Sequence, residues 1–325
     1  MMQRKSLIIA VIVLLIFAAV PANAEKRLAI GATVAASPFY GYFLTVAQLI
    51  NKNVKGVSTT VMETGATVDN LKRMKRGQVD LGLITTNTLH QAYYGTAKFK
   101  GNAIKSKILW IYFVAPQVTL VRKDSGVKNF KELNGKKFCA GLRGSSTEQT
   151  TMAVFDLLGV KPDYFKGSTA DYTAAVKDNR IAGYTGSIMG DSFSATMIDV
   201  AAFTPILMLG INQEQEAKIL KNLPELTIYD VPANKVIGNS PFKTWAFALG
   251  TSAAENMDKE TAYQIVKTVM ENKDKQTGAM PAIKGIDFAK ATIQMASSPL
   301  HPGAIKYLRE KGYKIPEKLI APEDR

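Results

Sequence analysis

Short apolar segments with strand character alternate along this chain with segments of helical periodicity. In the helical segments apolar residues recur at three- and four-residue spacing, as Phe43, Val46, Ala47 and Ile50 do. The strand-like segments are apolar or β-branched. In order, the first half predicts strand 27–31, helix 39–51, strand 57–64, a helix capped by Thr67 that stops near Gly77, and strand 79–84. This order predicts right-handed parallel units in a doubly wound α/β sheet.

The same alternation returns in the second half of the chain. The apolar run 108–121 is interrupted at Pro116, which is typical of a strand that leaves one domain and enters another. Further strands are expected at 137–142 and 244–249, with helices at 146–158, 171–178, 211–220 and 259–271, and a helical tail from 283 to 307 broken at Ser298-Pro299. Boundaries near Pro116 and Phe242 predict a discontinuous lobe 1 (25–116 and 242–325) and an inserted lobe 2 (117–241), with a hinge and a cleft between them.

The first 24 residues have the pattern of a secretory signal peptide. Arg4 and Lys5 precede the apolar run 7–20, and small residues end the segment at Ala24. A run of 14 residues (7 to 20) falls short of the roughly 20 needed to span a bilayer, although an uncleaved anchor remains the alternative. We therefore expect cleavage after Ala24 and a periplasmic mature protein of 301 residues (325 minus 24).

The chain is strongly basic, with a formal net charge of +14, or +12 once Arg4 and Lys5 are removed. This charge favours anionic partners: acidic solutes, anionic membrane surfaces or nucleic acid. The lysines are spread out and lack interleaved aromatic residues, which disfavours nucleic-acid binding. Attachment to an anionic lipid or polymer stays open as an alternative. Cys139 is the single cysteine, so no intrachain disulfide forms, and its apolar neighbours predict a buried strand position.

The residues suited to catalysis are few. His90 and His301 are the only histidines, and neither has the spacing of a metal site. No serine lies in a Gly-x-Ser-x-Gly pattern, and no cofactor or metal is expected. His301, between Pro299 and Pro302, is predicted to be a structural turn residue. An exported hydrolase or transferase on a similar scaffold remains an alternative, because catalytic triads are assembled in space and not in sequence.

Three strand-to-helix turns and the end of the third strand are rich in small and hydroxyl residues. In open α/β sheets, ligands bind beyond the carboxyl ends of the strands, where helix N-termini offer free N–H groups. The turn 141–148 combines glycines, three hydroxyls and Arg143, which suits a carboxylate, phosphonate or sulfonate. Neither this turn nor 31–40 is a P-loop or a full dinucleotide-binding fingerprint. The third turn is 63–70, and the end of the third strand is at 85–88.

In this order, the turns resemble the TAXI family of solute receptors from TRAP transporters. The resemblance covers nearly all of the mature chain and rests on these segments: 30–40, 63–71, Gly77-Gln78-Val79-Asp80-Leu81-Gly82-Leu83, 133–137, Gly144-Ser145-Ser146-Thr147 and Leu300-His301-Pro302-Gly303-Ala304-Ile305. The chain departs from the family pattern where Gly31-Ala32-Thr33-Val34 replaces a glycine-rich loop, and again at 39–40, 85–87 and 182–184.

The resemblance implies a two-lobed class II periplasmic binding protein that binds a small organic anion and delivers it to a TRAP-type permease, without catalysis. Arg143 would supply charge and Tyr40 a stacking or hydroxyl contact, while hydroxyl and amide groups would hydrogen-bond the ligand. The residues predicted to contact the ligand are Ser37, Tyr40, Thr67, Thr86, Asn87, Arg143, Ser145, Ser146, Thr147 and Tyr184.

Overall fold

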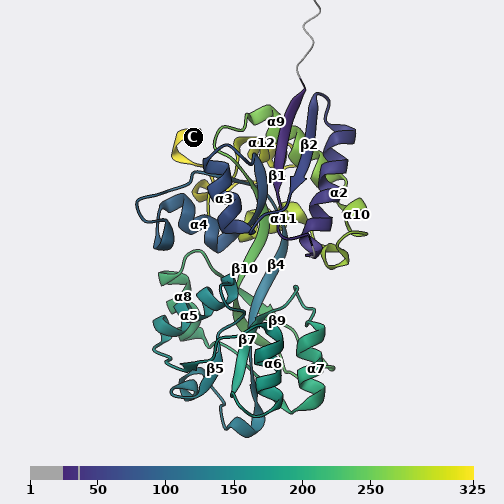
Figure 1. The fold of residues 1–325 in the computed structure, drawn as a ribbon. Coiled ribbons are helices and arrows are strands. Elements are labelled where there is room, and N and C mark those ends of the chain that lie inside the picture. The colour runs from purple at the N-terminus through teal and green to yellow at the C-terminus, as the bar shows by residue number, and fades with distance from the viewer. Residues whose placement is uncertain (1–24, 36) are drawn as a thin grey trace, which may run out of the picture.

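The computed structural model describes residues 25–35 and 37–325, so the expected signal peptide lies outside the described residues. The chain forms two α/β lobes joined by two long strands (Figure 1). These strands are β4 (Lys107–Arg122) and β10 (Phe242–Ala253), which pair antiparallel along lobe 1. In the described part of the chain, no helix combines the length and the apolar character needed to cross a membrane.

Lobe 1 is built on a mixed sheet with the strand order β2-β1-β3-β10-β4. Strands β1 (Lys26–Gly31), β2 (Val57–Met62) and β3 (Leu81–Thr85) are parallel to one another. Most of their residues are buried, and apolar helix faces cover the sheet because these helices carry amphipathic patterns. The helices of lobe 1 are α2 (Pro38–Asn53), α3 (Thr67–Lys75), α4 (Thr86–Tyr94), α9 (Lys259–Glu271), α10 (Lys273–Gln276), α11 (Phe288–Met295) and α12 (Pro302–Glu310).

Lobe 2 continues the same curled sheet from the second half of β4. There β4 pairs antiparallel with β7 (Gly183–Ser187) and β8 (Ile206–Leu209). Strand β5 (Lys137–Cys139) is parallel to β7 and to β6 (Asp163–Tyr164), and β9 (Thr227–Val231) pairs with β10. The helices of lobe 2 are α5 (Ser146–Leu158), α6 (Thr169–Lys177), α7 (Ala195–Phe203) and α8 (Gln213–Asn222).

Strand direction places the carboxyl ends of the two sets of parallel strands opposite each other. Strand β10 is antiparallel to both β3 and β4, so β1, β2 and β3 run in the direction of β4. Strands β5 and β7 run against β4. The segments that follow β1, β2 and β3 therefore face those that follow β5 and β7 across the middle of β4 and β10. This is the arrangement from which a ligand cleft between two lobes is built.

The strand predicted across 108–121 is confirmed: β4 runs through Pro116, which pairs with Ala246 of β10. A proline fits here because its carbonyl oxygen still accepts a hydrogen bond, from Ile188 N–H at 3.0 Å. Beyond it, Gln117–Val121 pair with β7. The predicted boundaries at 116 and 242 remain a prediction, although this change of partner lies at the first of them.

Most of the long helices follow their predicted bounds. Helices α5 and α9 match 146–158 and 259–271, and Gly159 ends α5 in the left-handed conformation (φ 72°). Thr67 is a correction: it is the first residue of α3, and Ala66 is the cap. The tail forms two helices separated by 296–301. The sequence analysis missed the short elements α4, β6, β7, α7, β8, β9 and α10.

Candidate functional site

The facing segments are defined as the five stretches that continue the parallel strands toward the other lobe. In lobe 1 they are residues 32–35 and 37–38 after β1, 63–67 after β2 and 85–87 at the end of β3. In lobe 2 they are residues 140–147 after β5 and 187–191 after β7. Of the ten residues predicted to bind ligand, eight lie in these segments, Tyr40 lies two residues beyond the first of them in α2, and Tyr184 lies inside β7.

Asn70 links the ends of β1 and β3 in lobe 1 through hydrogen bonds. It is fully buried in α3, and its amide Nδ2 lies 3.0–3.1 Å from the carbonyl oxygens of Gly31, Ala32 and Leu83. A side chain at Gly31 would clash with Asn70, since an added Cβ would lie 2.4 Å from Oδ1. The ends of β1 and β3 and the start of α3 are therefore fixed by one amide.

Ala66 has a strained backbone at the start of α3. Its φ of 62° and ψ of −153° lie in a region that residues other than glycine rarely adopt. No side chain accepts a hydrogen bond from the first N–H groups of α3, and such groups also lack partners within the helix. Strain of this kind is concentrated at binding sites, where the surrounding structure holds it in place.

Thr67 and Thr86 are both buried, and their hydroxyls accept backbone hydrogen bonds. The N–H of Thr85 donates to Thr67 Oγ1 at 3.1 Å, and the N–H of Ala248 donates to Thr86 Oγ1 at 2.9 Å. The first bond fixes α3 against β3 and the second fixes α4 against β10. A hydroxyl that accepts such a bond still has a proton to donate.

Helix α4 makes the polar contacts that join the two lobes. The Asn87 amide donates to Thr150 Oγ1 of α5 at 3.0 Å, and both side chains are buried. Gln91 Nε2 donates to Glu225 Oε1 at 3.4 Å. Just beyond α4, Lys98 Nζ donates to Gln149 Oε1 at 3.3 Å. We call α4 and these three hydrogen bonds the α4 strut; in Figure 1 it lies above α5 and α8. Asn87 Oδ1 has no hydrogen-bond partner among the described residues.

The segment after β5 leads into the capped N-terminus of α5. Ser145 Oγ accepts the Glu148 N–H at 3.1 Å, and Glu148 Oε2 accepts the Gly144 N–H at 2.6 Å. Gly141, with φ 141°, is needed here because an added Cβ would lie 2.8 Å from Glu148 N. Ser146 and Thr147 form the first turn of α5, whose N–H groups have no intrahelical partner. Arg143 is exposed beside this turn.

Gln117 and Ser187 lie where the two lobes meet and were not among the predicted site residues. Gln117 is fully buried and donates from Nε2 to Ala115 O at 2.6 Å and to Ser187 Oγ at 3.2 Å. Its Oε1 has no partner in the described part of the chain. Ser187 is exposed at the end of β7. The sequence feature that could have identified Gln117 is its position directly after Pro116, where the chain passes from one lobe to the other.

The remaining predicted residues lie farther from the facing strand ends or are committed to structure. Ser37 caps α2, accepting the Phe39 N–H at 3.3 Å, and Tyr40 is half-buried against the lobe 1 core. Tyr184 is buried in the lobe 2 core, with its ring centroid 4.6 Å from that of Tyr172. Burial raises the pKa of Tyr184, and its hydroxyl has no partner among the described side chains and backbone groups.

Two of the groups that could serve catalysis, His301 and Cys139, are held in structural roles. His301 caps α12: its Nδ1 accepts the Gly303 N–H at 3.1 Å and its Nε2 donates to Met257 O at 3.0 Å. The prediction that it is a structural turn residue is consistent with this geometry. Cys139 is buried, as predicted, and burial raises the pKa of its thiol to about 11. Across residues 25–35 and 37–325, no three His, Cys, Asp or Glu side chains are placed to hold a metal.

A model of the NMT1-like family matches residues 30–312, which is most of the chain. This chain belongs to the NMT1-like family. The NMT1-like chain also shares its fold with solved two-lobed proteins. XAC2383 from Xanthomonas citri, solved with chloride ion and with ATP, aligns with a TM-score of 0.51 and 13% identity over 88% of this chain and 99% and 95% of those chains. A TctC solute binding protein from Polaromonas aligns with a TM-score of 0.50 and 15% identity over 90% and 99%.

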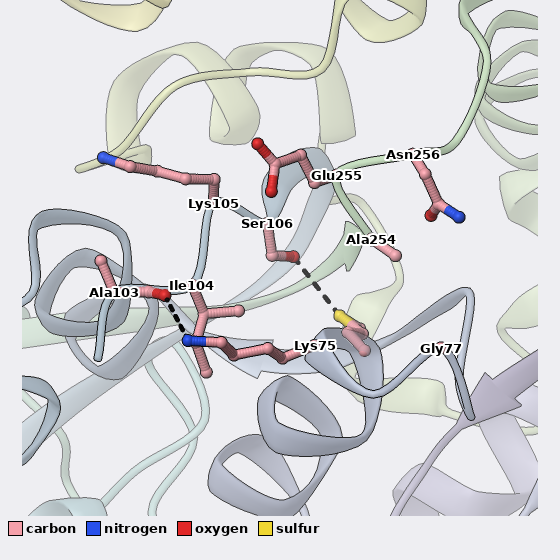
Figure 2. A pocket seen from close by; sticks show the side chains of 10 residues that line it. Lys75, Gly77, Ala103, Ile104, Lys105, Ser106, Ala254, Glu255 and Asn256 are labelled. Atoms are coloured by element: carbon pink, nitrogen blue, oxygen red, sulfur yellow. Dashed lines mark hydrogen bonds between the residues drawn. The ribbon is translucent and has the colours of Figure 1, made fainter.

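Two hollows of the NMT1-like protein lie away from most of the facing segments. One, of about 420 Å³, separates α4 and α11 from the α8–β9 connection and includes His90, Tyr94, Glu225 and Lys318 in its lining. The other, of about 400 Å³, lies at the far end of lobe 1 (Figure 2). There Lys75 Nζ donates a hydrogen bond to Ala103 O, and Ser106 Oγ donates to Ala253 O at 2.6 Å. Both side chains thus already have hydrogen-bond partners within the protein.

Proposed function

We propose that this protein is an extracytoplasmic solute-binding protein that holds a small organic anion between its two lobes. The observation that carries the proposal is the opposition of strand ends: the N-termini of α3, α4 and α5 all lie between the lobes. Helix N-termini favour negative charge because their N–H groups are free and their dipoles are positive. Membership of the NMT1-like family and a fold shared with a TctC solute binding protein agree with it.

The binding residues we propose are those on the facing segments. Arg143 supplies the positive charge, and Ser145, Ser146 and Thr147 supply hydroxyl and N–H donors at the start of α5. From lobe 1, Ser37, Tyr40, Thr67, Thr86 and Asn87 complete the set. Asn87 is the best supported of these, because it is buried between the lobes and its Oδ1 has no partner among the described residues. Tyr184 belongs to the proposed set only if its buried hydroxyl becomes accessible.

We also propose export and a membrane partner. Residues 1–24 carry the signal-peptide pattern, and the proposed mature protein starts at Glu25 in the periplasm. Delivery to a TRAP-type permease rests on the TAXI-like segments of the sequence. Uptake by membrane vesicles that contain such a permease tests this: ligand accumulation should require the mature protein and should stop when it is left out.

The proposed activity is binding without turnover. His301 has both ring nitrogens bonded to the backbone and Cys139 is a buried thiol, which leaves neither free to attack a substrate. A basic surface-binding protein is distinguished by salt, since exposed charges are screened within about 8 Å at physiological ionic strength. Binding between closed lobes should depend on salt much less than binding to an anionic polymer.

The decisive experiment measures the melting temperature of mature protein, stripped of carried-over ligand, against a panel of organic acids. A ligand at 1,000 times its Kd adds about 4 kcal/mol to stability, which raises the melting temperature of a chain this long by about 8 °C. The panel holds monocarboxylates, dicarboxylates, 2-oxo acids, glutamate, aromatic acids and sulfonates. A large shift with one acid that is recovered unchanged supports the proposal, and flat curves with every acid contradict it.

Arg143→Ala tests the proposed charge partner. We expect at least a tenfold loss of affinity, about 1.4 kcal/mol, because the ligand charge would lose its cation. The matched control is Arg180→Ala, which removes an exposed arginine paired with Asp178 at the opposite end of lobe 2. Equal affinity in both variants would remove Arg143 from the site.

A further inference from the structure

The facing segments contain several acidic groups but a single basic side chain. Arg143 is the one lysine or arginine in residues 32–38, 63–67, 85–87, 140–147 and 187–191. Glu63 and Asp191 lie in the same segments, and Glu148 follows directly. Lys98 lies outside these segments, just beyond α4, where its Nζ donates to Gln149 Oε1 of α5 at 3.3 Å. The space between the lobes therefore offers one cation within the segments themselves.

The three carboxylates hold the loops and are not paired with cations there. Glu63 Oε1 accepts the Ala35 N–H at 3.0 Å, and Glu148 Oε2 accepts the Gly144 N–H at 2.6 Å. Asp191 Oδ1 accepts the Tyr229 hydroxyl at 2.9 Å. These bonds keep negative charge on the facing segments of both lobes. A ligand with two carboxylates would place its second charge near these carboxylates, on segments that carry no second lysine or arginine, which is unfavourable.

Exposed apolar side chains occur on the same segments in both lobes. Val34 after β1 is 52% exposed, Leu142 after β5 is 45% exposed and Met189 after β7 is 37% exposed. Leu142 is the residue directly before Arg143. All three lie on segments that face the other lobe, so a ligand held between the lobes could cover them, and burying exposed apolar surface is favourable.

From these two observations we infer that the ligand is an amphipathic monoanion: one carboxylate-type charge attached to an aliphatic or aromatic body. The charge meets Arg143 and the N-terminus of α5, and the apolar body covers Val34, Leu142 and Met189. This inference rests on the proposed function, because it specifies what the same site binds. It favours fatty or aromatic monocarboxylates over dicarboxylates.

Matched pairs of acids test the inference by calorimetric titration of the mature protein. Hexanoate and adipate have six carbons each and differ by one terminal carboxylate. We expect hexanoate to bind at least tenfold more tightly than adipate. From butyrate to octanoate, each methylene that becomes buried should tighten binding by about fourfold, since this is the transfer free energy of one buried CH₂.

Matched variants test the apolar lining. Val34→Thr is close to isosteric and should weaken hexanoate binding severalfold, whereas Val236→Thr, at a valine that is 69% exposed between β9 and β10, should leave it unchanged. Leu142→Ala is compared in the same way with Leu44→Ala, at a leucine that is 44% exposed on α2. Melting temperatures of all four variants show whether each protein is folded.

The outcomes separate this inference from the proposed function. If adipate, glutamate or 2-oxoglutarate binds as tightly as hexanoate or more tightly, the inference is wrong and the solute-binding function stands. The inference is also wrong if Val34→Thr and Leu142→Ala bind hexanoate like their controls. If no acid of either kind binds, the proposed function itself fails.

Discussion

His301 fixes the start of α12 through both nitrogens of a neutral ring. Its Nδ1 accepts the Gly303 N–H, so the ring proton must be on Nε2, which donates to Met257 O. Burial lowers the pKa of His301 below its ordinary value of 6.5, and the charge of Lys107 lowers it further. A second proton would go to Nδ1 and would remove the acceptor that caps the helix.

A pH-dependent stability follows from this geometry. The unfolded chain protonates His301 near pH 6.5 while the folded protein resists, so the stabilisation is present above about pH 6.5 and is lost as pH falls below it. His301→Asn keeps a capping acceptor and removes the titration. We expect the melting temperature of the wild-type protein to exceed that of the variant by more at about pH 7.5 than at about pH 5.5. A gap that is constant with pH contradicts the assignment.

Gly82 is required by the close approach of two strand backbones. A Cβ added there would lie 2.4 Å from the carbonyl oxygen of Gly31, which cannot move without disturbing the pairing of β1 and β3. We expect Gly82→Ala to lower the free energy of unfolding by about 1–3 kcal/mol or more. Gly41→Ala is the control, since Gly41 lies in α2 with nothing within 4 Å, and it should stabilise by up to about 1 kcal/mol. Urea unfolding measures the change in the free energy of unfolding for both variants.

At the scale of elements, the α4 strut controls how the two lobes meet. The Asn87–Thr150 hydrogen bond is buried, while the Gln91–Glu225 and Lys98–Gln149 contacts lie nearer the surface. A buried donor that loses its acceptor costs more than an exposed one, because water cannot replace the bond. Most of the polar stabilisation of the strut should therefore come from its innermost bond.

Adjacent threonines of α5 offer a test of the strut. Thr150→Val removes the acceptor of the Asn87 amide and should lower the free energy of unfolding by about 1–3 kcal/mol. Thr151 is equally buried, but its Oγ1 has no partner among the described residues, so Thr151→Val should be neutral or stabilising. Both are measured by urea unfolding, and equal losses in the two variants would show that the strut bond contributes little.

The sequence predicted well those elements whose signals are local. Helix α5 is bounded by Ser145 and Gly159, and α9 has a continuous apolar face, so both were located to the residue. Strands β8 and β9 were missed because their strand state depends on pairing with β4 and β10, far away in the chain. In the site, likewise, the strand-end turns could be located from local signals. The hydrogen bond that the Thr86 hydroxyl accepts from Ala248, 162 residues away, could not be predicted in this way.

At the scale of the whole molecule, the chain has a tryptophan in each crossing strand. Trp110 of β4 donates to the Tyr42 hydroxyl in lobe 1. Trp245 of β10 packs against Phe130 and Phe155 of lobe 2, and its Nε1 has no partner within the described chain. Trp245 is fully buried beside the junction of the lobes.

These two residues provide a reporter of lobe movement. Because Trp245 lies at the junction, ligand-induced closure should change its fluorescence while the bonded Trp110 stays constant. Trp245→Phe should abolish the ligand-induced signal and Trp110→Phe should keep it, with ligand binding confirmed independently by calorimetry. A signal that persists in Trp245→Phe would locate the movement elsewhere.

The chain enters and leaves lobe 2 through strands that are direct neighbours, since Pro116 pairs with Ala246. The two points where the chain crosses thus lie about 5 Å apart, one strand spacing. A block with adjacent ends can be exchanged as a unit between related chains, because the host keeps its own core and needs only the same pair of strands. Gene fusions that swap residues 117–245, between this pair, could therefore recombine one half of a binding site with a new other half.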